Sequence, residues 1–316
     1  MKALIIGVGN IGMRHIQGLS KLKDDQKHIY LFDLNKTYRL RFENELSKLQ
    51  DKLNYFFVQN IQEVKNINFD LVIISTTANN RGKILNSILN ELKFEFIVIE
   101  KPICNSLDDL EILKKISNKK IFVNFPHRYC DWNLKIKKKI KEYFFNQKLE
   151  VFITGSNLNI ACNISHFIDL VNMWTGSLPI SVHHSDLNKW VKSKRDGFFE
   201  LDGCISITFQ NDHKLTIIQD QKYENQIIKI QSEQKENCCL INYLEGFAKF
   251  GKSEKLLGNI KYQSDSTDIL YKKLNSLNHE VTNLKLSVEC YSMVLKRLIE
   301  FWNQKKNTNE NKIIIT

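Results

Sequence analysis

The sequence predicts an α/β protein with two domains, a doubly wound parallel sheet followed by an α+β domain. First, the chain has 316 residues, which exceeds the size at which a single hydrophobic core usually stops growing. Second, short apolar segments alternate with amphipathic ones up to residue 123, as in parallel sheets with helical crossovers. Third, later segments alternate polar and apolar residues, as antiparallel strands do. We therefore expect domains at 1–123 and 124–316.

Six apolar segments of the first domain are expected to be strands. They are rich in Val, Ile and Leu, which indicates that helices cover both faces of the sheet. The strands are expected at residues 2–8, 29–34, 55–59, 70–76, 95–100 and 120–125. Amphipathic stretches at 81–92 and 106–117 are long enough to form helical crossovers between them.

The second domain is expected to begin with helices and to continue with strands. Helices are expected near 131–145 and 163–175, and strands at 179–192, 203–210, 213–220 and 226–243. Two later segments, 267–281 and 284–303, have the apolar period of helices. The helix near 285–303 is expected to pack back on the first domain.

The composition is that of an ordinary globular protein, with 42% hydrophobic and 26% charged residues. The formal net charge of +11 suits nucleic acid, a membrane surface or an acidic small substrate. The densest basic run, at 135–145, places Ile136 and Ile140 on one helix face and its lysines on the other, which indicates a solvated helix. Because no nucleic-acid recognition motif accompanies this run, no nucleic-acid partner is expected.

The cysteines and the N-terminal segment predict where the protein resides. The seven cysteines are irregularly spaced and include no CxxC pair, which favours reduced thiols and a cytoplasmic location. The apolar run at residues 3–6 is too short to span a membrane, and it is better explained as a strand entering a glycine turn than as a signal peptide. No membrane partner is expected.

A glycine-rich turn after the first strand predicts a dinucleotide site. Gly7, Gly9 and Gly12 form GxGxxG at the head of an amphipathic helix, where backbone amides can hold a pyrophosphate. Asp33 closes the second strand at the distance of about 20 residues at which a carboxylate binds the ribose hydroxyls. Since this carboxylate would repel a 2′-phosphate, NAD is expected in preference to NADP. The turn residues expected to contact the cofactor are Gly7, Val8, Gly9, Asn10, Ile11 and Gly12.

Two further motifs follow the glycine turn and Asp33 along the chain. A buried strand ends in Glu100, Lys101 and Pro102, and the stretch HFIDLVNMWTG begins at His166. GxGxxG, Asp33, EKP and this stretch together resemble the Gfo/Idh/MocA family of nicotinamide-dependent sugar and polyol oxidoreductases. The resemblance implies a Rossmann domain followed by a domain with a large, open, mostly antiparallel sheet. It also implies substrate binding by the second domain and a homo-oligomer formed through its sheet.

The resemblance also implies roles for particular residues. Lys101 corresponds to the lysine that lies between nicotinamide and substrate and binds the reacting hydroxyl. His166 corresponds to the histidine that exchanges a proton with this hydroxyl. Arg128 is the retained member of a pair of arginines and is a candidate for substrate binding. The remaining candidates for cofactor contact are Ser75, Thr76, Thr77, Glu100 and Lys101 itself, and Arg81 stands where many members have histidine.

Cys162 departs from the family, which usually has aspartate four residues before the histidine. Cys162 and His166 are four apart on a predicted helix, so a Cys–His nucleophile and a metal site are alternatives, although no further ligand or oxyanion pocket is evident and no metal is expected. The preferred interpretation is a small residue that packs beside the substrate. Asp169 is expected to be structural, facing solvent or the domain boundary.

These observations predict an NAD-dependent dehydrogenase or reductase that transfers hydride between the nicotinamide and a hydroxyl or keto carbon of a sugar. The missing aspartate and the positive charge favour an acidic or nucleotide-linked sugar, of the kind used in bacterial surface-polysaccharide pathways, including nonulosonic acids. A weakened catalyst is the other explanation for the loss of the aspartate. The alternatives are a non-catalytic dinucleotide-binding regulator and an epimerase that retains NAD.

Overall fold

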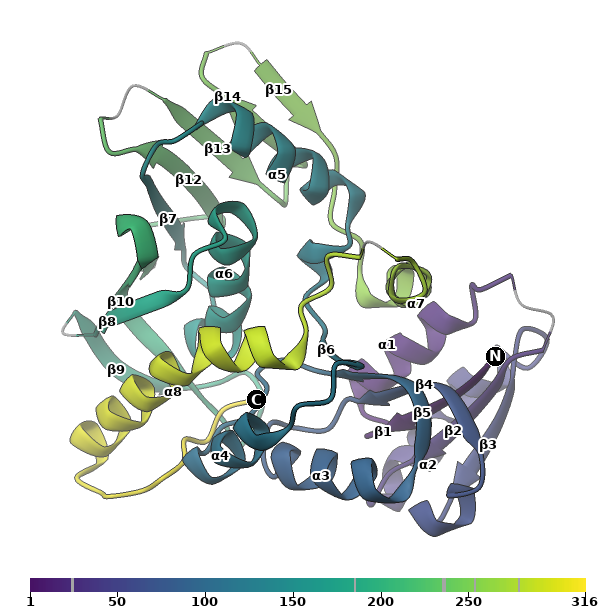
Figure 1. Ribbon diagram of the computed structural model, residues 1–316. Coiled ribbons are helices and arrows are strands. Elements are labelled where there is room, and N and C mark those ends of the chain that lie inside the picture. The colour runs from purple at the N-terminus through teal and green to yellow at the C-terminus, as the bar shows by residue number, and fades with distance from the viewer. Residues whose placement is uncertain (24–25, 185, 235–236, 253, 278) are drawn as a thin grey trace. The chain divides into compact units, whose positions relative to one another are not determined.

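The computed structural model describes residues 1–23, 26–184, 186–234, 237–252, 254–277 and 279–316. The chain forms two compact units (Figure 1). The first unit contains residues 1–104, 109–129 and 261–286, and the second contains 105–108, 130–260 and 287–316. The segment 261–286 thus belongs to the first unit, although it lies beyond the expected boundary at residue 123. No helix in the described part of the chain is both long and apolar enough to cross a membrane.

The first unit is built on a six-stranded sheet in which every neighbouring pair is parallel. The sheet order is β3 (Asn54–Val58), β2 (His28–Phe32), β1 (Lys2–Ile6), β4 (Asn68–Ile74), β5 (Lys93–Ile99) and β6 (Ile121–Val123). The order of the strands reverses between β1 and β4, which is where doubly wound sheets bind their ligands. The central strand β1 is buried from Ala3 to Ile6, as expected for a strand covered on both faces.

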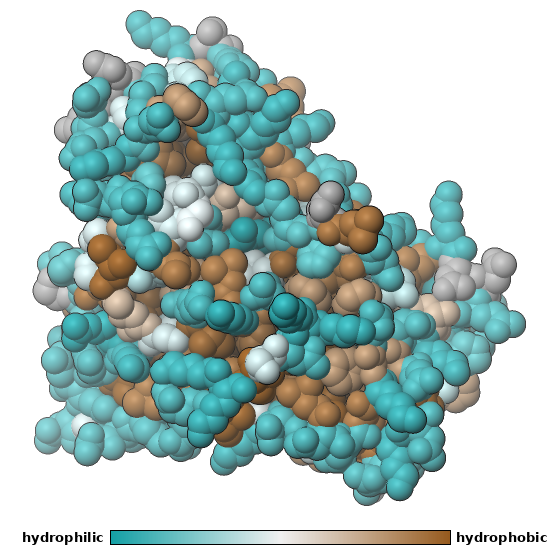
Figure 2. Space-filling view, viewed as in Figure 1, coloured by the Kyte–Doolittle hydropathy of each residue, from teal (hydrophilic) through white to brown (hydrophobic). Residues whose placement is uncertain are grey.

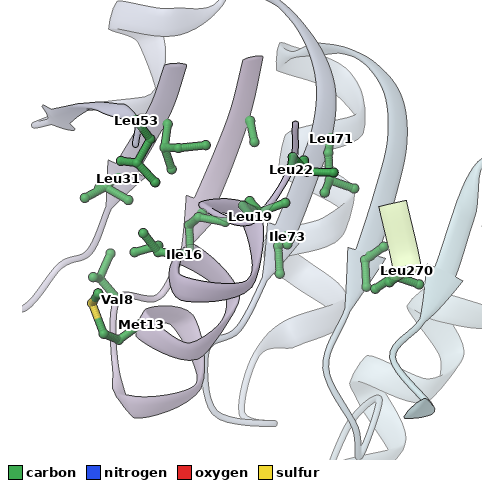
Figure 3. Close-up of a cluster of buried hydrophobic side chains, with 14 of the residues drawn as sticks. Val8, Met13, Ile16, Leu19, Leu22, Leu31, Leu53, Leu71, Ile73 and Leu270 are labelled. Atoms are coloured by element: carbon green, nitrogen blue, oxygen red, sulfur yellow. The ribbon is translucent and has the colours of Figure 1, made fainter. Parts of the chain in front are cut away.

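In the described part of the chain, the α-helices that accompany this sheet are α1 (Asn10–Leu19), α2 (Lys36–Ser47), α3 (Arg81–Glu91), α4 (Leu107–Lys115) and α7 (Thr267–Leu274). Helix α1 turns Met13, Ile16 and Leu19 toward the sheet, where they pack with Leu31 and Ile73 (Figure 3). This apolar face follows directly from the spacing of its residues.

Helix α7 belongs to the same core although it lies far along the chain, because Leu270 joins the cluster of α1 (Figure 3). At Gly18 the two helices approach so closely that a Cβ atom would lie 2.6 Å from the Cβ of Thr267. The helix expected over 267–281 ends at Leu274, because the side chains of Asn275 and Ser276 donate to carbonyls of its last turn.

The second unit contains a nine-stranded sheet in which β7 and β11 form the one parallel pair among the described strands. The sheet order is β15 (Glu254–Leu257), β14 (Phe247–Phe250), β13 (Cys238–Asn242), β12 (Ile227–Ser232), β7 (Leu149–Gly155), β11 (Lys214–Gln219), β10 (Phe199–Phe209) and β8 (Pro179–His183), with β9 (Leu187–Lys192) also paired to β10. These two sheets confirm the expected fold class: a Rossmann-type parallel sheet and a large, mostly antiparallel one.

Several expectations for this sheet were incomplete: the segment expected over 179–192 contains two strands, β8 and β9, and strand β7 was not expected. The segment expected as one strand over 226–243 contains the hairpin of β12 and β13, in which the amide of Ser232 donates to the carbonyl of Asn237. Strands β14 and β15 were not expected. They have only four residues each, too few for a period of two to be distinguished.

One face of the second sheet is covered by helices. Helix α6 (Ile160–Thr175) packs on β10 and β11, and α5 (Asp131–Tyr143) packs on α6. Along β7, Val151 and Ile153 are buried whereas Phe152 and Thr154 are partly exposed, so the strand distinguishes a covered face from an open one. Figure 2 shows one side of the molecule, on which hydrophilic side chains predominate.

The last helix, α8 (Leu284–Lys306), makes its aromatic contacts within the second unit. The ring of Trp302 lies 5.1 Å from that of Trp190 on β9 and 5.2 Å from that of Phe199 on β10, measured between centroids. From residue 287 onward the helix belongs to the second unit. Aromatic burial against β9 and β10 therefore decides its position, and periodicity alone did not identify that partner.

Candidate functional site

The glycine turn between β1 and α1 is shaped by two glycines that the protein itself requires. Gly7 has φ +92°, and a Cβ atom there would lie 2.7 Å from the amide nitrogen of Thr76. A Cβ atom on Gly12 would lie 2.2 Å from the carbonyl oxygen of Gly7. Larger residues at either position would force the backbone apart, so both glycines hold the turn closed against β4.

Gly9 is different, because nothing in the protein requires a glycine there. A Cβ atom on Gly9 would meet no atom within 4 Å, and its φ of −84° is open to any residue. No side chain caps α1, which begins at the next residue, and its first turn contains no acidic residue. The open space lies where unpaired amides and the helix dipole favour an anion. A bound pyrophosphate is therefore a physical reason for the missing side chain, and the turn fits a dinucleotide.

Asp33 is held beside this turn by two backbone amides. Its Oδ2 accepts a hydrogen bond of 2.7 Å from the amide of Val8, and its Oδ1 accepts one of 2.7 Å from that of Asn35. Each carboxylate oxygen has two lone pairs, so both retain capacity for a ribose hydroxyl. The structure thus places Asp33 and Val8 in contact, although the sequence suggested a separate role for each.

The segment after β4 also contacts the glycine turn. Ser75 Oγ donates to the carbonyl of Gly7 at 2.7 Å, so this hydroxyl fastens the end of β4 to the turn. Thr76 Oγ1 donates to the carbonyl of Thr77 at 3.1 Å. Ser75 therefore shapes the predicted cofactor site through the backbone, whether or not it also touches a ligand.

Arg81 joins the segments that follow β4 and β5. Its guanidinium is buried and donates to the carbonyls of Thr76, Glu100 and Pro102. A planar group with five donors suits such a bridge, which a histidine could not form. The sequence marked Arg81 only as a departure from the family, and the structure shows why its size and charge matter.

Glu100 lies at the centre of a buried polar network. Its carboxylate pairs with His15 Nε2 at 3.0 Å and accepts a hydrogen bond from Asn124 Nδ2. Burial by itself would raise the pKa of Glu100, but the hydrogen bonds from His15 and Asn124 and the positive charges of His15 and Lys101 outweigh it and hold this pKa below its ordinary value. Sequence reasoning missed His15 and Asn124. The one available signal was a histidine on the apolar face of α1.

Lys101 follows Glu100, is half-buried, and is joined to Pro102 by a cis peptide bond. Arg128 is buried in a short 3₁₀ turn after β6, beside His127. Desolvation lowers the pKa of His127 to about 4, so this imidazole is neutral at physiological pH. Both candidates, Lys101 and Arg128, belong to the first unit.

Helix α6 of the second unit presents the other candidates. Cys162 and His166 are half-buried at successive turns of one face, whereas most of the helix is buried. Asp169 is only 3% exposed, so of the two expected positions, solvent and the domain boundary, it does not face solvent. Residues three apart share one face of a helix, so Asp169 lies on the same face as Cys162 and His166.

A carboxylate from strand β10 nevertheless lies at the start of α6. Glu200 Oε2 accepts hydrogen bonds from the amides of Ala161 at 2.9 Å and Cys162 at 3.3 Å. Gln219 Oε1 accepts from the amides of Leu158 and Asn159 in the preceding loop. Glu200 on β10 thus caps the helix that carries His166, and no local sequence signal announced this contact.

The metal interpretation gains no support from the described residues. No three His, Cys, Asp or Glu side chains gather as a metal site in the described part of the chain. His184 packs its ring against Phe301 at 5.9 Å between centroids, and His183 lies within 3.4 Å of Ser181 Oγ.

The N-terminal part of the chain, which contains the parallel sheet, matches a known protein family. Residues 1–124 match the Gfo/Idh/MocA family, which is described as an oxidoreductase family with an NAD-binding Rossmann fold. This match confirms the resemblance deduced from the glycine turn, Asp33 and EKP. No curated protein sequence matches the chain.

Solved structures share the fold over nearly the whole chain. UDP-N-acetylglucosamine 3-dehydrogenase from Acidithiobacillus ferrooxidans is 11% identical with a TM-score of 0.68, over 94% of this chain and 96% of that one. Myo-inositol dehydrogenase from Lactobacillus casei, solved with NAD(H) and myo-inositol, is 15% identical with a TM-score of 0.66, over 100% and 97%. A Gfo/Idh/MocA family oxidoreductase from Vibrio cholerae is 12% identical with a TM-score of 0.67, over 96% and 99%. At these identities the likeness establishes the fold.

Proposed function

Because residues 1–124 match the Gfo/Idh/MocA oxidoreductase family, we propose that the protein is an NAD-dependent enzyme that transfers hydride between the nicotinamide and a hydroxyl or keto carbon of a sugar. The observation that carries the proposal is the turn at Gly9, where the protein leaves open the space beside an uncapped helix N-terminus. The carboxylate of Asp33, held beside this turn by the amide of Val8, completes a nucleotide site.

The bound nicotinamide would supply the hydride chemistry, and the protein would supply orientation and proton transfer. Lys101 is assigned to the reacting hydroxyl, as donor and acceptor of its proton. His166 is assigned to the same proton exchange, because an imidazole titrates near neutral pH. Arg128 and Cys162 are assigned to substrate binding, Cys162 as a small residue that leaves room for it.

We favour NAD over NADP and an acidic or nucleotide-linked sugar as substrate. Asp33 would repel a 2′-phosphate. The net charge of +11 and the absence of a second carboxylate at position 162 favour an anionic substrate, such as a nonulosonic acid or another sugar of bacterial surface polysaccharides. A structural neighbour acts, by its name, on a nucleotide-linked sugar.

We also propose a cytoplasmic homo-oligomer. The seven cysteines are irregularly spaced and include no CxxC pair, which favours reduced thiols. In the second unit, the open face of the large sheet has a hollow of about 450 Å³ lined by, among others, Phe152, Ile218, Ile227 and Leu240. An apolar face of this kind suits contact with a second copy of the chain.

The test of the function is the absorbance of reduced nicotinamide while the purified protein meets NAD and a panel of neutral sugars, uronates, nucleotide sugars and nonulosonates. We expect turnover on an acidic or nucleotide-linked member. Lys101→Met and His166→Ala should each reduce kcat at least about a hundredfold and leave NAD affinity within a few-fold. Unchanged turnover in either variant would remove that residue from the mechanism.

The same panel distinguishes the alternatives. Binding of NAD with no absorbance change and an inverted stereocentre in the product would identify an epimerase that retains its cofactor. Binding of NAD with no change in any sugar would identify a non-catalytic regulator, and the missing aspartate at position 162 would then be the cause.

A further inference from the structure

The entry of helix α6, which carries Cys162 and His166, is held by side chains that come from strands of the large sheet. Glu200 on β10 accepts hydrogen bonds at Oε2 from the amides of Ala161 at 2.9 Å and Cys162 at 3.3 Å. A helix usually receives such bonds from a short polar side chain at its own N-cap. Here the N-cap residue is Asn159, which has φ 50° and whose side chain forms no capping hydrogen bond. Glu200 therefore takes the place of a local cap.

Gln219 at the end of β11 holds the loop that precedes the helix. Its Oε1 accepts hydrogen bonds from the amides of Leu158 at 3.1 Å and Asn159 at 3.2 Å. Its Nε2 donates to the carbonyl of Leu201 on β10 at 3.1 Å, so both ends of the side-chain amide are used. Glu200 and Gln219, which we term the α6 anchor, together accept from four backbone amides at the entry of the helix. The chain therefore enters α6 along a path that the sheet fixes.

The α6 anchor is itself fixed, because the backbone at Glu200 is bound by two neighbouring segments. Glu200 pairs with Val191 of β9 in the sheet. The amide of the preceding residue, Phe199, donates to the carbonyl of Ile314 near the C-terminus at 2.9 Å, and the adjacent Ile313 is fully buried. Glu200 is 6% exposed, and burial of a carboxylate is costly unless its hydrogen bonds are formed. These contacts leave the carboxylate little freedom to move away from the amides that it binds.

The position of His166 depends on the entry of α6, because only one helical turn separates them. Cys162 and His166 lie at successive turns of one face and are half-buried, whereas most of the helix is buried. The amide of Cys162 is one of those that Glu200 binds, so the anchor holds the turn that precedes His166. A catalytic acid or base must lie within hydrogen-bond reach of its proton, and misplacement by about 1 Å can reduce a rate about a hundredfold. A shift of the first turn would therefore affect turnover more than the fold.

We propose that Glu200 and Gln219 are positioning residues, which fix the entry of α6 to the sheet and thereby set where His166 meets the reacting hydroxyl. The proposal rests on the function proposed for His166. Neither residue of the anchor needs to touch the substrate, because each acts through hydrogen bonds to backbone amides. An amide oxygen at position 200 can accept the same hydrogen bonds as the carboxylate, whereas an apolar side chain cannot. This difference separates positioning by hydrogen bonds from an effect of charge.

The position of the helix is tested without turnover, by hydrogen exchange and chemical labelling followed by mass spectrometry. Glu200→Met retains the length of the side chain but removes the acceptor, and Glu200→Gln is the matched variant that retains it. In Glu200→Met the amides of Ala161 and Cys162 should exchange at least about tenfold faster. Iodoacetamide should modify Cys162, and diethyl pyrocarbonate should modify His166, at least about threefold faster, because the first turn loosens. Glu200→Gln should stay within about twofold of the parent protein in each measurement.

Turnover tests whether this position matters for the reaction. With NAD and the sugar of the panel on which the parent protein is most active, Glu200→Met should lose at least about tenfold in kcat. Glu200→Gln should stay within about threefold. NAD affinity should be unchanged in both variants, because the glycine turn belongs to the first unit. Gln219→Met removes the acceptor for the loop and should change exchange, labelling and kcat in the same direction, so it provides the test if Glu200→Met does not fold.

His213→Leu is the control for a general loss of stability. It removes a hydrogen bond at the beginnings of β7 and β11, at the opposite end of β11 from Gln219. It should therefore destabilise the same sheet but leave kcat and the labelling of Cys162 and His166 as in the parent protein. Circular dichroism verifies that each variant is folded.

Faster exchange and labelling together with a lower kcat in Glu200→Met, with Glu200→Gln close to the parent protein, support the inference. Unchanged labelling in folded Glu200→Met and Gln219→Met overturns it. Unchanged kcat despite faster labelling also overturns it, since Glu200 would then be a helix cap only, as does an equal loss in Glu200→Gln or His213→Leu. Absent turnover in the parent protein would instead contradict the proposed function, and the labelling would still show whether the α6 anchor positions His166.

Discussion

At the scale of single residues, the three glycines of the turn have two different roles. Two of them are required by the packing of the protein, and the third leaves space for a ligand. A Cβ atom at Gly7 or Gly12 would lie only 2.7 Å or 2.2 Å from neighbouring backbone atoms, whereas one at Gly9 would have no neighbour within 4 Å. The same amino acid therefore serves packing at two positions and ligand approach at the third.

This difference predicts opposite behaviour for two alanine variants. Gly9→Ala should keep the free energy of unfolding within about 0.5 kcal/mol but weaken NAD binding at least about tenfold, because the methyl group occupies the space for pyrophosphate. Gly12→Ala should lower the free energy of unfolding by about 1–3 kcal/mol through overpacking. Chemical denaturation and NAD titration of both variants give the comparison, and equal NAD affinity in Gly9→Ala would exclude a phosphate at this turn.

Asp33 carries a second prediction at this scale. Asp33→Ala removes the acceptor for the ribose hydroxyls together with the charge that repels a 2′-phosphate. NAD affinity should fall by about tenfold or more and NADP affinity should fall less or rise. Fluorescence titration with both dinucleotides measures the ratio. A parent protein that already prefers NADP would contradict the role given to Asp33.

At the scale of elements, local patterns located most strands and helices but not their partners. The glycine turn, β1 and α1 were expected because their signals lie within a few neighbouring residues. The cap of α6 was not, because Glu200 lies 38 residues from Cys162 in the chain. Likewise, alternation of polar and apolar residues does not show where one strand ends and the chain turns back. The hairpin of β12 and β13 was therefore expected as a single segment.

His213 gives a prediction at this scale, because it joins the beginnings of β7 and β11. Its Nδ1 accepts a hydrogen bond of 2.9 Å from the amide of Leu149, which a protonated ring could not do. Desolvation lowers the pKa of His213, although the charge of Asp212 opposes this shift. As pH falls below about 6.5, the unfolded chain binds a proton that the folded one refuses. The free energy of unfolding should therefore fall as pH decreases through this window.

His213→Leu isolates this contribution. At a pH of about 7.5 the variant should be less stable by about 1–3 kcal/mol, because the amide of Leu149 loses its acceptor. Between about pH 6.5 and pH 5 the variant should lose less stability than the parent, since the titrating group is gone. Urea denaturation at a series of pH values measures the difference. Parallel pH profiles for the two proteins would show that His213 is not the group responsible.

At the scale of the whole molecule, the chain passes between its two units more often than the sequence suggested. Residues 261–286 belong to the first unit, where α7 joins the core of α1 and Thr267 reaches His15. This third segment supplies part of the buried network at Glu100. A boundary drawn at residue 123 would therefore separate His15 from one of its hydrogen-bond partners.

The open face of the large sheet carries the prediction for assembly. Leu240 lines the hollow of this face and is 37% exposed, whereas Leu244 is 77% exposed and does not line it. Leu240→Lys should shift the sedimentation mass toward the monomer, because a charge would be buried between copies. Leu244→Lys is the matched control and should not. A parent protein that sediments as a monomer would reject the proposed interface.

The sequence by itself determined the order of the strands of the parallel sheet along the chain, the glycine turn, Asp33 and the fold class, because each depends on residues that are close along the chain or on a repeated period. Only the tertiary structure decided the pairing of His15 with Glu100 and Thr267, the bridge formed by Arg81, and the cap that Glu200 provides for α6. His15 is 85 residues from Glu100 and 252 from Thr267. Such contacts arise when distant segments pack and must satisfy every buried polar group, a condition that no local pattern expresses.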